Sequence, residues 1–401
     1  MKRPAFALAL VCLGAMVAPL DTAVNVAFPA IAAAFGVAPR DIVWVIIAFV
    51  FTQSLSSLVF GRLGDLYGHR RMFLVGMAGS VLAHGALALA GDFLSLVVLR
   101  ALQGAAVGMA MACAPALVSM ASSPAERPKA LALYASAISG ALALGPLAGG
   151  WLIDWFGWPG VFLYRAPLAL LVLLLAPWGL ALAAQTTGTA TRPPAAAVAW
   201  SALRARPFLG LQGASVFVQG ALFSIMLWVP FALAGWPALR VAGAGALIAL
   251  FPAGSLMASL WLARYRGAAS RLRSQALVRK GQWLAAAGLA LIALVLPAQS
   301  SAMLAAALWL AGVGMGIFQV GYQEGTLEAV PADNRGLAGS LINVTRLLGI
   351  VLGAILSGAV GASLGVVMAI AFSAAALAVW TCLFLIFLQS APSARADPSE
   401  N

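Results

Sequence analysis

Long apolar runs, interrupted by short polar stretches, form the dominant pattern along this chain of 401 residues. Runs such as LALLVLLLAPWGLALAA do not alternate between apolar and polar positions, so they predict helices rather than the strands of a membrane barrel. An apolar run of roughly 20 residues is long enough to cross a bilayer as a helix. Twelve spans are predicted, at about 5–34, 41–60, 72–91, 93–120, 129–151, 160–184, 207–235, 240–263, 281–297, 299–323, 336–360 and 362–389.

The composition leads to the same class of protein. Hydrophobic residues make up 63% of the chain and charged residues 8%, against roughly 45–50% and 25% in ordinary soluble domains. So few charges cannot cover the surface of a soluble protein of this size. The chain is therefore predicted to be an integral membrane protein of the all-α class.

The first span also carries a feature of secretory signal peptides. Lys2 and Arg3 precede its apolar run. The run continues well past the length of a signal peptide and contains polar residues, so we interpret it as a retained transmembrane helix. The three cysteines lie in apolar segments at unrelated spacings, which indicates small buried side chains rather than a disulfide framework or a metal site.

The two sets of six spans repeat each other. The string VGMAMACAPALVSMASSPAERPKALA resembles VGMGIFQVGYQEGTLEAVPADNRGLA, which places Gly108 opposite Gly314 and Pro124 opposite Pro331. An even number of spans in each copy keeps both copies in the same orientation, as in transporters with parallel repeats. We predict a first bundle over residues 1–184, a linker loop over 185–206, a second bundle over 207–389 and a tail over 390–401. Chance similarity between two helices rich in alanine and glycine is the alternative.

The basic residues predict the orientation of the spans. If both termini face the cytoplasm, 18 of the 23 Lys and Arg residues lie in inner loops and two, Arg40 and Arg240, in outer loops. This bias follows the positive-inside rule. It accounts for the net charge of +12 through topology and contact with anionic lipid, so no nucleic-acid partner is needed.

The stretch PLDTAVNVAFP places Asp21 and Asn25 inside the first span, four residues apart, so we expect them to share one helix face. Pro19 and Pro29 cannot donate to the carbonyls four residues back, which leaves free backbone acceptors nearby. A carboxyl that moves between an apolar environment and one beside an arginine can bind a proton in one state and release it in the other. The candidate partner is Arg100 in the fourth span, whose repeat-related positions are alanines near Ala306. A permanent bond to a neighbouring helix is the alternative role for Asp21.

Two glycine-rich strings are further candidates. GRLGDLYGHRR, from Gly61 to Arg71, is interpreted as a tight cytoplasmic turn followed by a basic cluster, or as a turn with topogenic arginines only. GALALGPLAGGWL is predicted to kink the fifth span and to give it a flat face for another helix. A static packing seam is the alternative for that face.

These strings together resemble the major facilitator superfamily, and within it the proton-coupled multidrug antiporter branch usually drawn with fourteen helices. GRLGDLYGHRR is similar to the superfamily's loop between helices two and three, and LRALQGAAVG to the fourth-helix motif with its coupling arginine. GPLAGGWL resembles the antiporter motif, and LDTAVNVAFPAI the first-helix motif of the branch. WPGVFLYRAP and PADNRGLAGSLINVTRLLG extend the resemblance over nearly the whole chain.

The chain also departs from that branch. The spacing from Asp21 to Asn25 is one residue shorter than is common there, the extra helix pair between the halves is absent, and Arg165 stands where asparagine is common. An added buried cation at that position would favour anionic substrates. The loop after the eighth span keeps only a degenerate copy of the loop motif.

The resemblance implies a twelve-helix transporter that exports a small organic compound in exchange for protons by alternating access. Asp21 and Arg100 would couple protons, and the loop residues Gly61, Gly64, Asp65, Gly68, Arg70 and Arg71 would gate. The antiporter motif comprises Gly145, Pro146, Gly149 and Gly150. The predicted substrate cavity comprises Asn25, Gln53, Arg165, Gln219, Gln319, Tyr322 and Glu324.

The proton gradient would supply the energy, with no cofactor and no metal, and the protein would act as a monomer in a bacterial cytoplasmic (inner) membrane with both termini inside. A proton symporter that imports a metabolite and a non-transporting sensor are the alternatives. An enzyme is not predicted, because His69 is assigned to a loop and His84 is isolated, which leaves no nucleophile–base cluster.

Overall fold

The computed structural model describes residues 3–123, 125–180, 204–265, 272–329 and 335–389. Within these ranges the fold is all-helical, and twelve helical segments are long and apolar enough to cross a membrane. Both predictions from the apolar runs are thereby confirmed. The linker over 185–203 and the tail over 390–401 lie outside the described residues.

Six spans form the first bundle. In chain order its elements are α1 (Arg3–Met16), η1 (Pro19–Thr22), α2 (Ala23–Phe35), η2 (Pro39–Ile42), α3 (Val43–Tyr67), α4 (His69–Ala88), α5 (Phe93–Met120), α6 (Arg127–Phe156), α7 (Gly160–Leu163) and α8 (Ala166–Gly179). The first span packs inside this bundle, since Leu10 and Phe6 of α1 lie against Gly179 of α8.

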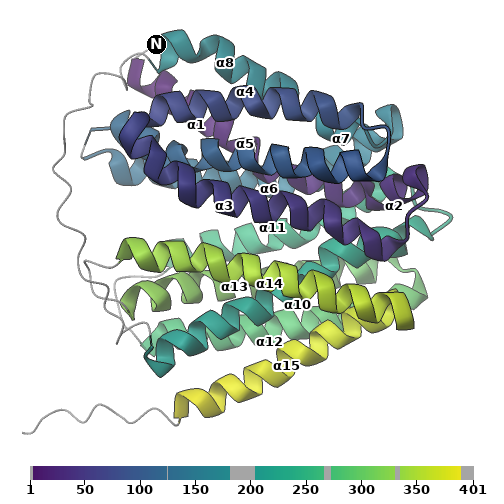
Figure 1. Cartoon of the computed structure of the whole chain (residues 1–401). Helices are drawn as coiled ribbons and strands as arrows, with labels where there is room; N and C mark the ends of the chain where they lie inside the picture. The colour runs from purple at the N-terminus through teal and green to yellow at the C-terminus, as the bar shows by residue number, and fades with distance from the viewer. Residues whose placement is uncertain (1–2, 124, 181–203, 266–271, 330–334, 390–401) are drawn as a thin grey trace, which may run out of the picture.

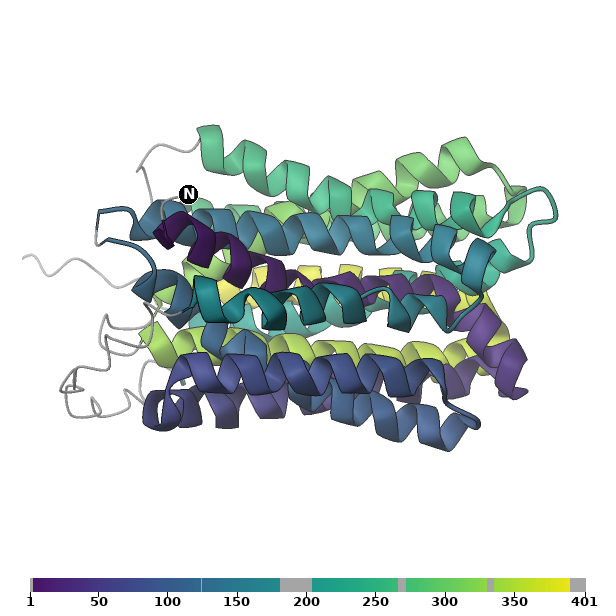
Figure 2. The ribbon, with the colours of Figure 1, turned by 90° about the horizontal axis from the view of Figure 1, so that it is seen from above.

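The other six spans form the second bundle. Its elements are α10 (Arg206–Ala234), α11 (Val241–Tyr265), α12 (Leu272–Val295), η4 (Leu296–Ala298), α13 (Ser301–Glu328), α14 (Arg335–Leu364) and α15 (Val366–Gln389). Helix α12 begins nine residues before the span expected at 281, because the basic segment ahead of the apolar run is helical too. In Figure 1 the first bundle lies above the second, and Figure 2 shows their helices running side by side along the long axis.

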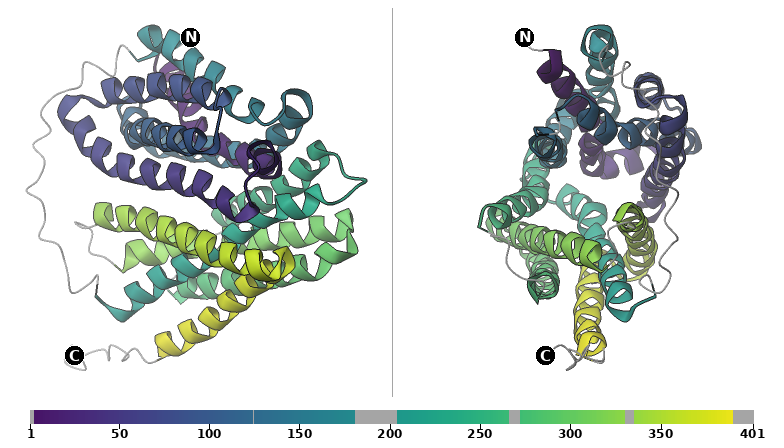
Figure 3. Two further views of the ribbon diagram at one scale, coloured as in Figure 1. Left: turned by 45° about the vertical axis from the view of Figure 1, so that its right-hand side comes forward. Right: turned by 90° about the vertical axis from the view of Figure 1, so that its left-hand side faces the viewer.

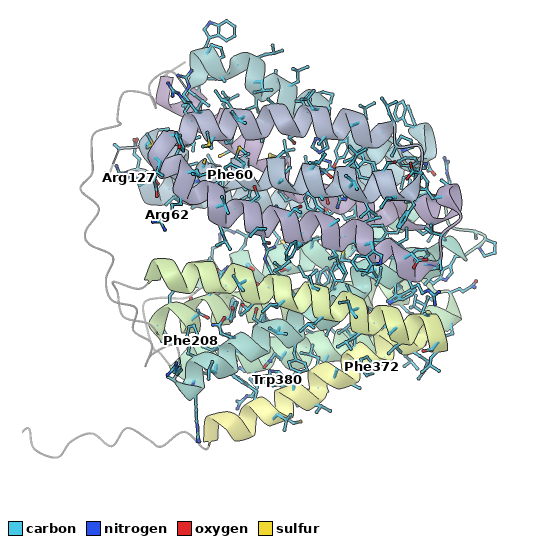
Figure 4. The ribbon with its side chains drawn as sticks, viewed as in Figure 1. Phe60, Arg62, Arg127, Phe208, Phe372 and Trp380 are labelled. Carbon is cyan, nitrogen blue, oxygen red and sulfur yellow. The ribbon has the colours of Figure 1, made fainter. Side chains whose placement is uncertain are left out.

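Helix α1 begins and α15 ends at the same end of the molecule (Figure 1). Arg62 and Arg127 lie at this end as well (Figure 4). We call it the basic end, since α4, α10 and α12 also start there with basic residues. The other end, which carries Arg40 and Arg240, is called the opposite end.

The bundles are duplicated, but with a register different from the predicted one. Helices α5 and α13 are both 28 residues long, and their starts (93 and 301) and ends (120 and 328) both differ by 208. A Cβ on Gly108 would meet α3, and a Cβ on Gly316, which is 208 residues later, would meet α11. Gly314 instead faces Ala285 of α12. The predicted pairing of Gly108 with Gly314 is therefore wrong by two residues, and the counterpart of Arg100 is the buried Leu308 rather than an alanine.

The two bundles meet at the opposite end. A Cβ on Gly150 of α6 would lie 2.7 Å from the carbonyl oxygen of Val241 in α11, and one on Gly245 of α11 would meet the carbonyl of Pro146. Asp154 lies 3.6 Å from Nη2 of Arg240 across the same contact. The view along the helices in Figure 3 (right) shows the first bundle above the second.

Aromatic packing fixes the last helix on the second bundle. The Trp380 indole of α15 stacks on the Phe217 ring of α10 at 4.4 Å between centroids, with an interplanar angle of 8°. It also covers Gly213 of α10, where a Cβ would collide with the ring. Figure 4 shows Trp380 between α15 and α10. A small residue on one helix and a tryptophan on the other thus let them approach closely.

Candidate functional site: a buried ion cluster at a helix break

The first span is broken at Asp21. Pro19 has no N–H, so it cannot donate the hydrogen bond that would continue α1, which ends at Met16. The chain instead makes three-residue turns, with the Asp21 N–H donating to the Ala18 carbonyl at 3.0 Å. Asp21 therefore sits in the 3-10 turn η1, and Asn25 lies in α2. Helix α2 follows η1 without a gap, and no contact between the two side chains is described, so the shared face of Asp21 and Asn25 stays a prediction.

Arg100 of α5 binds the Asp21 carboxylate through two parallel hydrogen bonds. Its Nη1 donates to Oδ1 at 2.7 Å and its Nη2 to Oδ2 at 2.8 Å. Its Nε also donates to the Val45 carbonyl at 3.0 Å, and the guanidinium lies 4.2 Å from the Phe49 ring centroid. The predicted meeting of Asp21 and Arg100 is confirmed, with the bidentate geometry typical of strong arginine–carboxylate pairs.

A second arginine, Arg165, binds the same carboxylate. It precedes α8, and its Nη1 donates to Oδ1 of Asp21 at 2.6 Å. Its side chain is fully buried, whereas that of Asp21 is 13% exposed. Nη2 makes a long bond of 3.4 Å to the Val161 carbonyl, and Nε has no partner among the described residues. Sequence reasoning placed Arg165 in the substrate cavity, but the structure places it in the ion cluster.

One carboxylate thus faces two guanidinium groups. The ion pairs described for Arg100 and Arg165 both go to Asp21, so this part of the described structure carries one unit of excess positive charge. Charged groups inside a membrane are costly and are usually functional. We call Asp21, Arg100 and Arg165 the ion cluster.

The ion cluster extends to His84 through Gln103, a connection that sequence reasoning did not predict. Gln103 lies three residues after Arg100; its Oε1 accepts from Arg100 Nη1 at 2.6 Å and its Nε2 lies 3.4 Å from Oδ1 of Asp21. Nε2 of Gln103 is also 3.0 Å from Nε2 of His84. On its other side, the His84 Nδ1 is 2.5 Å from the Ser80 carbonyl oxygen. His84 was predicted to be isolated, and the structure corrects this.

Helix α6 lies between the ion cluster and the second bundle. Gly145 packs against Thr22, and a Cβ on Gly149 would come 2.6 Å from the carbonyl oxygen of Ala23. The Thr22 hydroxyl donates to the Leu142 carbonyl at 3.2 Å, which ties the turn to α6. The motif's Pro146 and Gly150 contact α11, as described above. The flat helical face predicted for this motif is thereby confirmed, and it contacts both bundles.

The other residues of the predicted cavity lie on four different helices, α2, α3, α10 and α13. Tyr322 is buried inside the second bundle, where its hydroxyl donates to Gln212 at 2.9 Å and lies 2.8 Å from the Thr345 hydroxyl. Gln219 is buried and Glu324 is exposed. The described pockets have other linings: one lies between α3 and α14 beside Arg40, and the other between α11 and α12 beside Trp283. The cavity formed by Asn25, Gln53, Gln219, Gln319, Tyr322 and Glu324 stays a prediction.

The predicted gating turn is mostly helix. Helix α3 continues to Tyr67, so Gly61, Gly64 and Asp65 are helical rather than in a turn, and only Gly68 connects α3 to α4. Gly68 has a φ of +94°, which only glycine adopts without strain. His69 is the first residue of α4 rather than a loop residue, and its Nε2 lies 3.2 Å from Asp65. Arg70 and Arg71 follow it in α4, and the gating role of the segment stays a prediction.

The fold and the site define a class of protein: a multi-pass membrane protein of two duplicated six-helix bundles with a buried ion cluster in the first. The model of the Major Facilitator Superfamily matches residues 7–279, and the chain belongs to this family. The resemblance stated from the motifs is thereby confirmed at the level of the family.

Individual relatives agree with this assignment. The chain is 32% identical over 173 residues to the tetracenomycin C resistance and export protein of Streptomyces glaucescens, a match that covers 43% of this chain and 32% of that protein. It is 36% identical over 154 residues to the puromycin resistance protein pur8 of Streptomyces alboniger, covering 38% and 31%. The matched region thus spans about a third of the length of each relative.

The fold also matches solved structures. A crystal structure of a POT family transporter in complex with a thioalcohol-conjugated peptide superposes with a TM-score of 0.80 over 96% of both chains, at 12% sequence identity. This likeness concerns the fold. Membership of the family agrees with the prediction of a membrane protein that is not an enzyme.

Proposed function

We propose that this protein exports a small organic compound in exchange for protons, by alternating access between its two bundles. The observation that carries the proposal is the position of Asp21, a buried carboxylate held by two arginines at a helix break that packs against α6. Protons would bind and leave at this carboxylate.

The charges of the ion cluster support a link between proton binding and conformation. With Asp21 ionised the cluster carries one excess positive charge, and with Asp21 protonated it would carry two. The second state is costly in a closed, dry interior and less costly when water reaches the site. Protonation would therefore favour a conformation in which the cluster is hydrated, and a ligand that distinguishes two conformations shifts their populations.

Helix α6 would carry this change to the second bundle. It contacts the residues after Asp21 through Gly145 and Gly149, and α11 through Pro146 and Gly150. A shift of the turn at Asp21 would thus move α6 and change its contacts with α11, where the bundles meet. Closure at the opposite end, as in this structure, would alternate with closure at the basic end.

The distribution of basic residues supports the orientation. The positive-inside rule assigns the basic end to the cytoplasm. Both termini would then face the cytoplasm, with the protein spanning a bacterial inner membrane. We expect the protein to act as a monomer. The names of the Streptomyces relatives, which concern tetracenomycin C and puromycin, support an organic compound as substrate.

Liposomes with the reconstituted protein and an interior pH dye test the proposal. Labelled puromycin and tetracenomycin C are loaded inside, as is 2-naphthoate with its shape-matched amide. For an exchanger, acidifying the outer medium accelerates loss of a carried compound from the liposomes and acidifies their interior faster than in liposomes without protein. Flux that is indifferent to the pH gradient would refute proton coupling.

A second candidate, import of an organic acid together with a proton, is favoured by Arg165. Its Nε is buried without a described partner, and protonation of Asp21 would release its Nη1 as well. A carboxylate could then accept two hydrogen bonds from the guanidinium. The same liposomes, with 2-naphthoate supplied on both sides, separate the candidates: outer acid drives 2-naphthoate inward in symport and outward in exchange.

A further inference from the structure

The buried His84 is a titratable group that the proposed mechanism leaves unused. It is fully buried in α4, and the charged groups that face it are Arg100 of α5, Arg165 at the start of α8 and Asp21 of η1, with Ser80 and Gln103 as polar neighbours. Resting on the proposed function, we propose that His84 is a positioning residue of the proton site, which acts by fixing the orientation of the Gln103 amide.

The hydrogen bonds determine the tautomer of His84. A backbone carbonyl can only accept, so Nδ1, at 2.5 Å from the Ser80 carbonyl oxygen, must carry the proton. The neutral ring then presents Nε2 as an acceptor, and Nε2 lies 3.0 Å from the amide nitrogen of Gln103. A second proton on the ring would add charge beside two arginines and would face a donor, so the ring stays neutral.

This acceptor sets which end of the Gln103 amide faces Arg100. With its nitrogen toward His84, the amide directs Oε1 to Arg100 Nη1 at 2.6 Å. The reverse orientation would bring the amide N–H groups against the guanidinium N–H groups, donor against donor. His84 therefore keeps an acceptor in front of Arg100 that does not depend on Asp21.

That second acceptor matters when Asp21 binds a proton. A protonated Asp21 no longer compensates Arg100, which retains the Gln103 oxygen and the Val45 carbonyl as partners. Fewer acceptors for a buried guanidinium make the protonated state more costly. Loss of the His84 acceptor should thus require more protons outside to reach the same proton-driven flux.

Replacement of His84 tests this role in the liposome assay. We expect His84→Leu to move the pH of half-maximal proton-driven flux by at least half a unit toward acid, with gradient-free exchange of the carried compound unchanged. His84→Gln, which keeps a side-chain acceptor, should bring the pH of half-maximal flux most of the way back to the wild-type value. Ser80→Ala is the matched control, because the main bond comes from the Ser80 carbonyl, and it should leave the profile unchanged.

A double-mutant cycle separates positioning from packing. Gln103→Leu should shift the profile as His84→Leu does, and the double variant should shift it no further, since both remove the same acceptor. The proposal would be overturned if the two shifts in pH were additive in the double variant. It would also be overturned if His84→Leu lowered gradient-free exchange as much as proton-driven flux, or left the pH of half-maximal flux unchanged.

Nitrogen NMR gives a test that needs no substrate. The chain has two histidines, so in protein labelled with ¹⁵N-histidine the His69→Gln variant leaves His84 as the source of the imidazole signals. We expect Nδ1–H with an unprotonated Nε2, and no titration between pH 5 and 8. The opposite tautomer, or titration in that range, would overturn the proposal. If instead wild-type flux ignored the pH gradient while the tautomer was as expected, the proposed function would fail and the geometry would stand.

Discussion

The backbone of Gly149 in α6 lies directly against that of Ala23 in α2, so that a Cβ on Gly149 would come 2.6 Å from the Ala23 carbonyl oxygen and 2.9 Å from its Cα. Ala23 is two residues from Asp21. The contact therefore joins the helix between the bundles to the turn that holds the acid. If α6 slides along α2, the backbone of Ala23 must move past Gly149.

We expect Gly149→Ala to force these helices apart and to lower transport at least tenfold. Overpacking of this kind costs about 1–3 kcal/mol, so thermal unfolding in detergent should occur at a lower temperature. Gly140→Ala is the matched control in the same helix, since nothing lies within 4 Å of its Cβ. Wild-type flux in Gly149→Ala would show that the contact is not used in transport.

The balance of charge predicts an order of stability among variants of the ion cluster. Asp21→Asn leaves two buried guanidinium groups without a carboxylate, and breaking a buried pair costs about 3–5 kcal/mol. Arg165→Gln should cost less, because Asp21 keeps both bonds to Arg100. Adding Arg165→Gln to Asp21→Asn should raise the unfolding temperature again. A double variant less stable than Asp21→Asn would contradict this charge balance.

The connection between α3 and α4 predicts a backbone effect at Gly68. Its φ of +94° and ψ of 124° are accessible to glycine and strained for other residues. Gly68→Ala should therefore destabilise the protein by about 1–3 kcal/mol, the usual cost of such strain, although nothing lies within 4 Å of its Cβ. Gly85→Ala, also with open space but inside α4, is the control for the unfolding measurement. Equal unfolding temperatures of the two variants would argue against strain at Gly68.

Much of the fold follows from the sequence, because apolar runs of sufficient length leave few alternatives in a bilayer. The meeting of Asp21 and Arg100 was also predictable, since an acid and a base at similar depth in one bundle have reason to pair. The repeat register was not, because strings rich in glycine and alanine align almost equally well two residues apart. The bounds of α5 and α13 and the packing of Gly108 on α3 and of Gly316 on α11 define it.

The rest of the site depends on packing between helices. The signal for His84 was present, as Ser80 is four residues before it and Gln103 three residues after Arg100, but their contact requires the approach of α4 and α5. Gly76 permits this approach, since a Cβ there would lie 2.7 Å from the Ala106 carbonyl oxygen. The glycines at 61 and 64 suggested a turn, but both lie inside α3. In sequence, a glycine that lies in a helix cannot be told from one that forms a turn.

The role of Asp21 as the proton site is the central claim, and one comparison tests it most directly. Liposomes with wild-type protein, Asp21→Asn or Asp41→Asn are given the same pH gradient, and flux of the carried compound and interior pH are followed together. Asp41 lies at the opposite end in η2, outside the ion cluster, and is the matched control. The account predicts that Asp21→Asn loses gradient-driven flux and proton movement while Asp41→Asn keeps both. Proton-driven transport at the wild-type rate in Asp21→Asn would contradict it.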